Sequence, residues 1–388
     1  MNFRSDNRAQ SIQVGAVLLF GFLILALTLY QAQGVPEENK QVEFEHSQQV
    51  GDEMVDLYTA VFETVHLDGE PRTATITLGT SYNNRLFFIY PPPASGTLQT
   101  TADKPVRLHN VTSVTHPDTN QSFDNYWDNS TRTYEAQAIT YSPNYRVLRG
   151  TADYQIEYGM LAAEYDESNT TELRLAEGHQ PIVTDEDETD GVSDINLVLI
   201  DGDLQSVDTD TESVIPERAT ESTEVTVTNG SNDGPITLEL PTELPADSWE
   251  PGRNESIFDD DEYAKNVSVS GGTATIQLNR SKTYNLTIHK VDVGAGASEP
   301  EPTYLQNSSY SGSDLEFKIR DQFNDPVEES VDVWVFNGSG AVAENSTGKS
   351  RIKKSVALDG VDDPCGIALD DDIGSTVAYE RINATEAC

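Results

Sequence analysis

The first 36 residues contain the longest apolar run of the chain. Residues 9–36 carry no charged side chain, and the nineteen residues Ile12–Tyr30 are almost entirely apolar. A membrane-spanning helix needs about 20 apolar residues, whereas the core of a cleaved secretory signal has only about 7–15. The pattern predicts a transmembrane helix over residues 10–32, after a polar leader of residues 1–9. The alternative is a signal-peptidase site at Ala32-Gln33-Gly34, which would release the rest of the chain.

The flanking charges predict the orientation of this helix. Arg4 and Arg8 precede the span, and the next basic residue is Lys40. Positive charge is retained on the cytoplasmic side of a membrane. We therefore expect a single-pass protein of the cell membrane, in contact with membrane lipid, with the bulk of the chain extracytoplasmic.

A second helical pattern follows, and it predicts a stalk over residues 33–70. Pro36-Glu37-Glu38 is typical of a helix start, and Gly69 and Pro71 of its end. Gly51 inside the pattern predicts a break. One apolar stripe at helical spacing consists of Val50, Met54, Leu57, Tyr58, Val61, Phe62 and Val65. We expect the stalk to continue the membrane helix and to pack on the first β domain through this stripe, since the stripe is too short for a coiled-coil seam.

From Arg72 onward the apolar period changes to two, which favours β-strands. Gly, Asn, Asp and Pro separate the short runs, and Ser270-Gly271-Gly272 predicts a hairpin. A short helix is expected at Leu244–Trp249. The predicted strands are Thr73–Leu78, Arg85–Tyr90, Val147–Leu148, Tyr154–Tyr158, Ile195–Ile200, Glu224–Thr228, Ile236–Leu240, Val267–Val269, Ala274–Leu278 and Tyr284–Val291. The predicted fold is mainly β: two or three β-sandwich domains after the helix, with one or two of them in residues 71–292.

Residues 293–302 have the composition of a linker, and the strand pattern resumes after them. The segment Leu315–Val327 alternates and then enters the turn Asp321-Gln322-Phe323-Asn324-Asp325-Pro326-Val327, followed by an apolar run at Val331–Phe336. This arrangement resembles the opening of bacterial immunoglobulin-like domains of the invasin type. The resemblance covers residues 303–388 and implies a domain that acts as a spacer or presents another part.

The junction before the span resembles a second family. The run Asp6-Asn7-Arg8-Ala9-Gln10-Ser11-Ile12-Gln13-Val14-Gly15 is similar to the class III signal of archaeal type IV pilins and archaellins. The resemblance implies cleavage between Ala9 and Gln10 by a prepilin peptidase. The retained helix would then lie in the membrane or in a filament core, with other pilin-like subunits or a cell-surface layer as partners. An ordinary N-terminal signal anchor is the alternative.

The charge of the chain indicates a salt-adapted source. Its formal net charge is −42, with nine lysines and fifteen arginines. Such a charge repels itself at low salt, and multimolar salt screens the repulsion. Disorder is the alternative for an acidic chain, but sixteen Tyr, twelve Phe and three Trp favour folded cores. A nucleic-acid partner is excluded, because no basic surface is available to neutralise phosphates.

The most frequent functional motif is the N-glycosylation sequon, N-x-[S/T]. Thirteen occur, all after the span: Asn110, Asn120, Asn129, Asn169, Asn229, Asn254, Asn266, Asn279, Asn285, Asn307, Asn337, Asn345 and Asn383. They predict a glycoprotein, although Asn, Ser and Thr also occur together in ordinary turns. The two cysteines, Cys365 and Cys388, predict one disulfide in an oxidising compartment, with two free thiols as the alternative.

No pattern for catalysis is found. The six histidines form no metal-ligand spacing, and no nucleophile or phosphate-binding motif occurs. The acidic runs Asp185–Asp190 and Asp259–Glu262 contain ligands that suit Ca²⁺, but solvated loops explain them better. We expect no catalytic residue, metal or cofactor, and a structural or adhesive surface component of a halophilic archaeon. The alternative is an extracytoplasmic enzyme or ligand-binding protein with a site among the β domains.

The charge generates a first prediction. The thermal unfolding midpoint of the chain beyond the span should rise strongly between low and multimolar salt, because the Debye length falls from about 10 Å at 0.1 M to about 3 Å at 1 M. Calorimetry across a KCl series measures this, and an unchanged midpoint would contradict salt adaptation.

Overall fold

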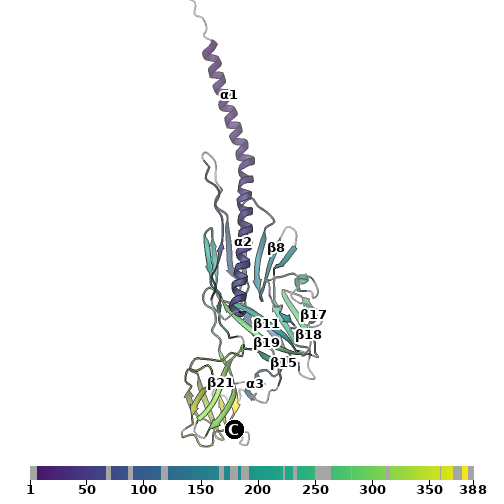
Figure 1. The fold of residues 1–388 in the computed structure, drawn as a ribbon, viewed down its shortest axis with the longest axis vertical. Coiled ribbons are helices and arrows are strands. Elements are labelled where there is room, and N and C mark those ends of the chain that lie inside the picture. Colours follow the sequence, from purple (N-terminus) through teal and green to yellow (C-terminus); the bar gives the residue numbers. More distant parts are fainter. Residues whose placement is uncertain are drawn as a thin grey trace, which may run out of the picture.

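The structure is a computed structural model. It describes residues 7–66, 71–85, 91–114, 121–165, 170–174, 182–184, 192–221, 223–229, 234–249, 264–280, 282–311, 314–358, 360–369 and 378–382. The predicted fold class is confirmed: after one long N-terminal helix, the described chain is mainly β (Figure 1).

The N-terminal helix runs without interruption from the apolar segment into the β region. It consists of α1 (Asn7–Leu29), a π-helical turn η1 (Tyr30–Gly34) and α2 (Val35–His66). A helix of this length extends about 90 Å. The predicted break at Gly51 is wrong, since α2 continues through that residue, and Pro36 does not start a separate helix. Proline lacks the N–H of a helical bond and crowds the preceding turn; the chain accommodates it with η1, where the Val35 N–H bonds to the Tyr30 carbonyl.

Four sheets form the β region that follows the helix. The first pairs β1 (Ala74–Thr77) with β13 (Thr211–Val214). The second has the order β10 (Val183–Thr184), β11 (Val192–Asp201), β19 (Thr283–Asp292), β15 (Val225–Thr228) and β4 (Thr112–Ser113), and β14 (Glu217–Arg218) also pairs with β19. The third has the order β12 (Gln205–Asp208), β2 (Ser95–Thr100), β6 (Ile139–Asn144), β7 (Ala152–Glu157), β8 (Met160–Tyr165) and β9 (Thr170–Arg174). The fourth has the order β17 (Ala264–Val269), β18 (Thr273–Leu278), β16 (Thr237–Pro241), β3 (Lys104–His109) and β5 (Arg132–Ala136). Two short helices, α3 (Gln121–Tyr126) and the 3₁₀-helix η2 (Ala246–Trp249), complete this part.

Two further sheets form the C-terminal domain. One has the order β20 (Pro302–Ser311), β21 (Asp314–Asp321) and β24 (Lys354–Ala357). The other has the order β23 (Gly340–Ser346), β22 (Asp332–Asn337), β25 (Gly366–Ala368) and β26 (Tyr379–Arg381). Phe317 from the first sheet and Val335 from the second share one buried core, so the two sheets pack as a sandwich.

The parallel pair β11–β19 is the centre of the larger β region. Its strands are in register from Val192↔Thr283 to Asp201↔Asp292. Leu197 and Leu199 belong to a core shared with β3, β16 and β18, whereas Val198 and Ile200 belong to a second core that includes α2. Strands buried on both faces have continuous apolar runs. The run Ile195–Ile200 therefore predicts β11 from the sequence alone.

The apolar stripe of the stalk packs into this second core, as predicted. Val50, Met54, Leu57, Tyr58, Val61 and Val65 are all buried, and Phe62 is half-buried. The Tyr58 hydroxyl also donates to the carbonyl of Gly159, beside β7 and β8. The second half of the long helix is therefore an internal element of the β region (Figure 1).

One predicted strand is wrong and another lies mostly outside the description. Residues 147–148 are not extended in a sheet, because their backbone N–H groups bond to the Glu43 carboxylate. Arg85 is not in a strand, and the rest of its predicted run, residues 86–90, lies outside the described residues.

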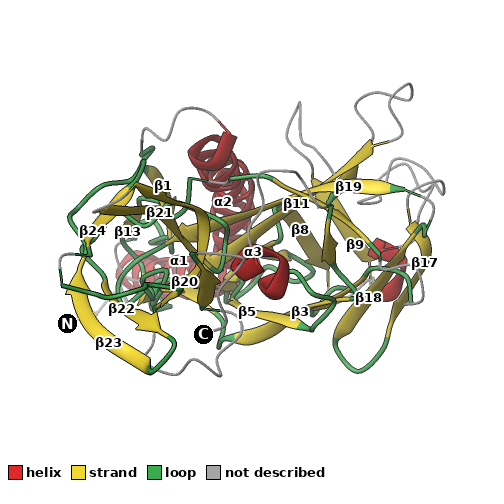
Figure 2. Ribbon diagram, turned by 90° about the horizontal axis from the view of Figure 1, so that it is seen from below, coloured by secondary structure: helices red, strands yellow, loops and turns green. Residues whose placement is uncertain are grey.

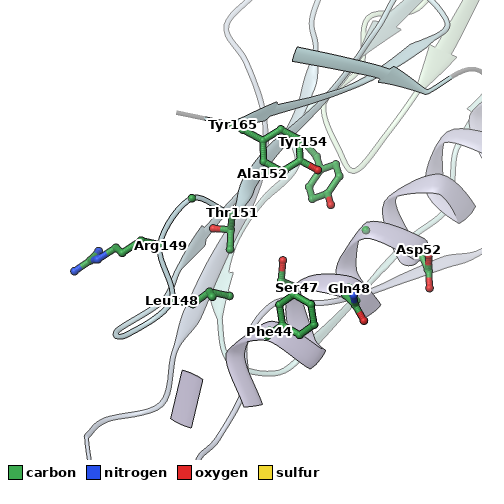
Figure 3. Close-up of a pocket in the computed structure, with 12 residues that line it drawn as sticks. Phe44, Ser47, Gln48, Asp52, Leu148, Arg149, Thr151, Ala152, Tyr154 and Tyr165 are labelled. Atoms are coloured by element: carbon green, nitrogen blue, oxygen red, sulfur yellow. The ribbon is translucent and has the colours of Figure 1, made fainter. Parts of the chain in front are cut away.

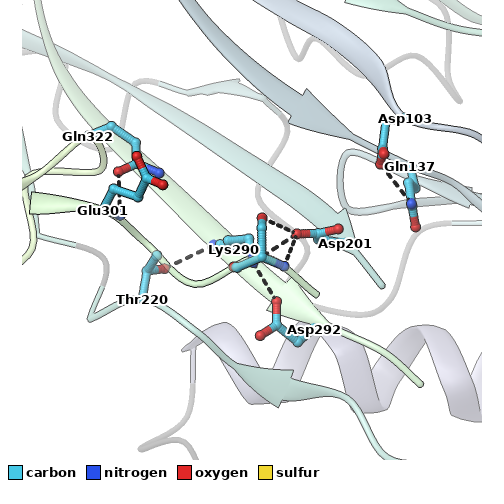
Figure 4. A network of polar contacts seen from close by, with 9 residues as sticks. Asp103, Gln137, Asp201, Thr220, Lys290, Asp292, Glu301 and Gln322 are labelled. Atoms are coloured by element: carbon cyan, nitrogen blue, oxygen red, sulfur yellow. Dashed lines mark hydrogen bonds and ion pairs between the residues drawn. The ribbon is translucent and has the colours of Figure 1, made fainter. Parts of the chain in front are cut away.

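The predicted linker is not a free connection over its first half. Val293 is buried, and the Asp203 N–H donates to the Ala295 carbonyl. Lys290, itself buried, lies 3.0 Å from Asp201 and 2.8 Å from Asp292 (Figure 4). The Asp201 carboxylate also accepts bonds from the Ser298 N–H and hydroxyl, which fixes residues 293–298 beside the ends of β11 and β19.

The turn after β21 joins the C-terminal domain to the larger region. Phe323 packs against Tyr134 with ring centroids 5.5 Å apart, and Tyr304 stacks on Tyr126 at 4.8 Å. The Asn324 amide donates to the carbonyl of Glu224 at 3.2 Å. Figure 2 shows α3, which ends at Tyr126, beside β20. The turn predicted as an immunoglobulin-like feature therefore also forms the joint between the domains.

Asp321 organises this joint from inside. Its carboxylate accepts the N–H groups of Phe323, at 2.8 Å, and Asp325, at 2.9 Å. Burial, with added repulsion from Asp325, raises the pKa of Asp321 to about 7. Glu157, at the end of β7, is buried as well, and burial raises its pKa to about 7.

These two carboxyls generate a pH prediction. In the unfolded chain they ionise near pH 4, whereas the folded chain keeps them protonated up to about pH 7. Their stabilising effect is complete below pH 4 and is lost as the pH rises to 7. Urea unfolding across this range should show a shallower loss of stability in Asp321→Asn than in the wild type, and a still shallower loss in the double variant with Glu157→Gln. The same pH dependence of the unfolding free energy in all three proteins would contradict the raised pKa values of these carboxyls.

Candidate functional site: the long helix and the cleft beside it

The exposed half of the long helix is the most unusual surface of the molecule. Twelve large apolar side chains between Ile12 and Leu29 are 40–77% exposed. No part of the most apolar stretch of this helix is buried. Each such side chain gains about 1.5–3 kcal/mol when it leaves water. This surface therefore requires an apolar environment, either lipid or other protein. The helix is long and apolar enough to cross a membrane, a test that a signal sequence also passes.

Polar contacts surround α2 where the helix enters the β region, and we call this set the collar: Glu38, Asn39, Glu43, His46, Tyr82, Arg85 and residues 145–148. The centre of the collar is Glu43, which is fully buried. Its carboxylate accepts the N–H groups of Arg146 at 2.7 Å, Val147 at 2.9 Å and Leu148 at 2.5 Å, and also the Tyr82 hydroxyl. Buried charge is costly unless donors surround it, and here four donors do so.

His46 and Arg85 extend the collar on either side. The His46 ring lies 2.7 Å from the Tyr145 hydroxyl through Nδ1 and 3.0 Å from the Thr77 carbonyl through Nε2. Burial lowers the pKa of His46, so the ring is neutral and both ring nitrogens are used. Arg85 donates to Glu38 at 2.7 Å and to Asn39 at 3.2 Å. The collar therefore fixes the rotation and the depth of α2 in the β region.

A cleft of about 480 Å³ opens directly beside the collar (Figure 3). One wall is a face of α2, formed by Phe44, Ser47, Gln48, Gly51 and Asp52. The opposite wall consists of Leu148, Arg149, Gly150, Thr151, Ala152, Tyr154 and Tyr165, from the segment before β7 and from β7 and β8. At 1.5 Å per residue, the cleft lies about 20–30 Å along the helix from the end of the apolar segment.

The predicted processing site and cysteines are only partly described. Ala9 and Gln10 lie within α1, but their side chains are outside the described residues. Cys365 is buried and disulfide-bonded. Its predicted partner, Cys388, lies outside the described residues.

No sequon asparagine with a described side chain is buried. Asn266 is exposed, and the half-buried ones are Asn110, Asn129, Asn229, Asn279, Asn285, Asn337 and Asn345. The amide of Asn110 donates to the Pro235 carbonyl, and that of Asn337 to the Asp362 carbonyl. The side chain of Asn307 is not described, and Asn120, Asn169, Asn254 and Asn383 lie outside the described residues.

The described residues contain no metal-binding cluster. Among them, no group of three or more His, Cys, Asp or Glu side chains is arranged to hold a metal. His109 is half-buried beside Thr131 and Glu239, on the surface of the fourth sheet, and the cleft is lined by one carboxylate, Asp52, and no histidine. The acidic runs at 185–190 and 259–262, together with His116 and His179, lie outside the described residues.

Comparison with known proteins gives little information about activity. No family model matches the chain, and no solved structure matches it. An uncharacterized protein of Archaeoglobus fulgidus is 34% identical over 94 residues, which cover 24% of this chain and 16% of that protein. The chain thus spans about one sixth of that relative, whose name states no function.

The collar generates the third prediction. Glu43→Ala should destabilise the protein by about 3 kcal/mol, because three part-buried backbone N–H groups lose their acceptor at about 1 kcal/mol each. Glu45→Ala is the matched control, since Glu45 is exposed on the same helix and accepts a bond from its helix neighbour Gln41. Chemical unfolding of the full chain in detergent measures both variants. Equal stability of the two variants would show that the collar contributes nothing.

Proposed function

We propose that this chain is a membrane-anchored, extracytoplasmic surface protein of a halophilic archaeon. In this proposal it is a pilin-like structural or adhesive component that displays its β domains. The observation that carries the proposal is the single helix that is exposed and apolar over Ile12–Leu29 and buried over Val50–Val65. Such a helix is an anchor and a structural core element at once.

The continuity of the helix supports retention of the anchor. The alternative cleavage site, Ala32-Gln33-Gly34, lies within η1, where the backbone is helical and Val35 bonds back to Tyr30. Tyr30 also donates its hydroxyl to Glu38, which binds Arg85 of the collar. Cleavage at this site would therefore need local unwinding of a segment that is tied to the β region.

The orientation is supported by the sequence. Arg4 and Arg8 stand before the span and favour a cytoplasmic N-terminus. All thirteen sequons and all acidic residues except Asp6 follow it, as expected of a glycosylated domain in a salty exterior. The described sequon side chains are exposed or half-buried, which suits modification.

In the pilin-like part of the proposal, the exposed apolar segment occupies two environments in turn. Before assembly it lies in lipid, and in a filament it packs against the same segment of other copies. Both environments are apolar and both satisfy the exposed side chains. A prepilin peptidase acting between Ala9 and Gln10 would leave the apolar helix at the new N-terminus.

Display rather than catalysis is supported by the chemistry of the described surface. Buried ionisable groups such as Glu43, Asp321 and Lys290 each bond to backbone or to partners within the fold. They hold elements together, and none of the three lines the cleft beside α2. We therefore infer a role in presenting the C-terminal domain away from the membrane.

The fourth prediction concerns the anchor. Mass spectrometry of protein from its native host should find Gln10 as the first residue, and deletion of Ile12–Tyr30 should release the β domains from the membrane fraction. A variant with nineteen leucines in place of Ile12–Tyr30 is the control, because it restores anchoring without the native packing surface.

The outcomes separate the two parts of the proposal. Membrane retention of the deletion variant would contradict anchoring by this helix. A mature chain that keeps Met1–Ala9, or begins at Val35, would contradict pilin-like processing. If the polyleucine variant is anchored and still enters filaments, specific helix packing is not needed for assembly.

A further inference from the structure

The cleft beside the collar has the geometry of a built binding site. Phe44, Gln48 and Asp52 follow each other at four-residue spacing, so they form one stripe along α2. The view in Figure 3 shows Ser47, Gln48 and Asp52 on the helix, opposite Tyr154 and Thr151. The volume of about 480 Å³ lies within the range of about 300–1,000 Å³ that is typical of ligand sites.

Both walls of the cleft are held in place by the collar. Glu43, adjacent to Phe44, fixes the backbone of residues 146–148, which leads into the opposite wall. Tyr145 is held by His46, adjacent to Ser47. A ligand would therefore enter a preformed cleft, and little of its binding energy would be lost to ordering the walls.

The lining combines aromatic rings with small hydrogen-bonding groups. Phe44 is 46% exposed, so a large ring surface faces solvent at the cleft. Ser47, Gln48, Asp52 and Thr151 supply hydroxyl, amide and carboxylate groups. Arg149 points away from the helix in Figure 3, which leaves no cationic group aimed between the walls in that view. This set does not suit a phosphate, which needs clustered donors or positive charge, and it is too polar for a lipid chain.

We propose that this cleft binds a short, uncharged oligosaccharide. Sugar rings present C–H faces, which pack on aromatic rings, and hydroxyl edges, which bond to amide, hydroxyl and carboxylate groups. Phe44 and Tyr165 would contact ring faces, and Gln48 and Asp52 would bind hydroxyl groups. A sugar ligand would give the proposed adhesive function a chemical target. The sugar proposal rests on that function only for its biological setting.

Binding can be tested with the full chain in a zwitterionic detergent at multimolar KCl. Glycosidic detergents are avoided because their headgroups are themselves sugars. The probes are maltotriose, cellotriose, N,N′,N″-triacetylchitotriose and mannotriose, with inorganic phosphate as an ionic probe. Isothermal titration calorimetry and saturation-transfer NMR report binding and the sugar protons that contact the protein.

We expect at least one of these sugars to bind, with aromatic side chains saturating its ring protons, and no binding of phosphate. Phe44→Ala and Gln48→Ala should each weaken this binding about tenfold, which corresponds to about 1.4 kcal/mol. Ile352→Ala is the matched control, because Ile352 is an apolar side chain that is 81% exposed in the C-terminal domain. Melting curves check that all three variants are folded.

Three results with the wild type and the cleft variants would overturn the proposal: no binding of any of the four sugars at millimolar concentration, binding of phosphate alone, or sugar binding that Phe44→Ala and Gln48→Ala leave unchanged. None of these results depends on whether Ile12–Tyr30 anchors the chain, since that is measured separately by membrane fractionation. A loss of binding in Ile352→Ala as well would place the sugar elsewhere and contradict the assignment to the cleft.

Discussion

One helix must satisfy two different environments, and the rest of the structure follows from this constraint. Its first half exposes apolar side chains on all sides, so it is stable only where water is absent. Its second half has one apolar stripe and must bury that stripe in protein. Because the helix is continuous, the β region is fixed rigidly to whatever surrounds the first half. The π-helical turn at Tyr30–Gly34 lies at the change between the two environments, where Pro36 would otherwise crowd a regular helix.

Burial of polar groups then fixes the position of this helix more strictly than apolar packing alone. An apolar stripe tolerates small rotations and shifts, because dispersion contacts are weakly directional. Glu43 does not, since its carboxylate meets three successive N–H groups at hydrogen-bond distance. A shift of one residue would leave these part-buried groups without their acceptor, at a cost of about 3 kcal/mol. The same contacts shape the cleft, so the position of α2 and the proposed sugar site depend on one set of interactions.

The sequence predicted the elements whose signal is local. Ile12–Tyr30 and the stripe from Val50 to Val65 are helical patterns that depend on few other parts of the chain. The strand Ile195–Ile200 was also clear, because burial on both faces gives a continuous apolar run. By contrast, β2 (Ser95–Thr100) has the sequence SGTLQT, with one large apolar residue, and it is a strand because β6 and β12 pair with it on either side. Such a strand has no signal of its own.

The residues of the collar and the joint could not be recognised from the sequence for a related reason. Glu43 is one of 66 acidic residues, and only its distant partners at 146–148 distinguish it from the solvated ones. Val147–Leu148 looked like a strand because both residues are apolar, but their N–H groups bond to that carboxylate. The linker composition of residues 293–302 is real, yet Gly202 and Gly294 allow two backbones to approach so closely that the segment docks. A Cβ on Gly202 would lie 2.1 Å from the Val293 carbonyl oxygen, which no other residue type could accept. The role of these glycines is set by a contact between segments about 90 residues apart.

Rigid attachment at both ends of the larger β region has a mechanical consequence. Force applied to the C-terminal domain reaches the helix through the joint, where Tyr304 and Phe323 pack against the aromatic rings of Tyr126 and Tyr134. It then passes through the parallel pair β11–β19, whose ten-residue register must shear as a whole, and through the collar. The segment 293–298 is also attached to these strands. Lys290 binds the Ser298 carbonyl and, at the ends of β11 and β19, the carboxylates of Asp201 and Asp292. A flexible linker would let the terminal domain swing and would transmit little tension. The observed arrangement instead holds that domain at a fixed distance and direction from the long helix, which suits the display role proposed above.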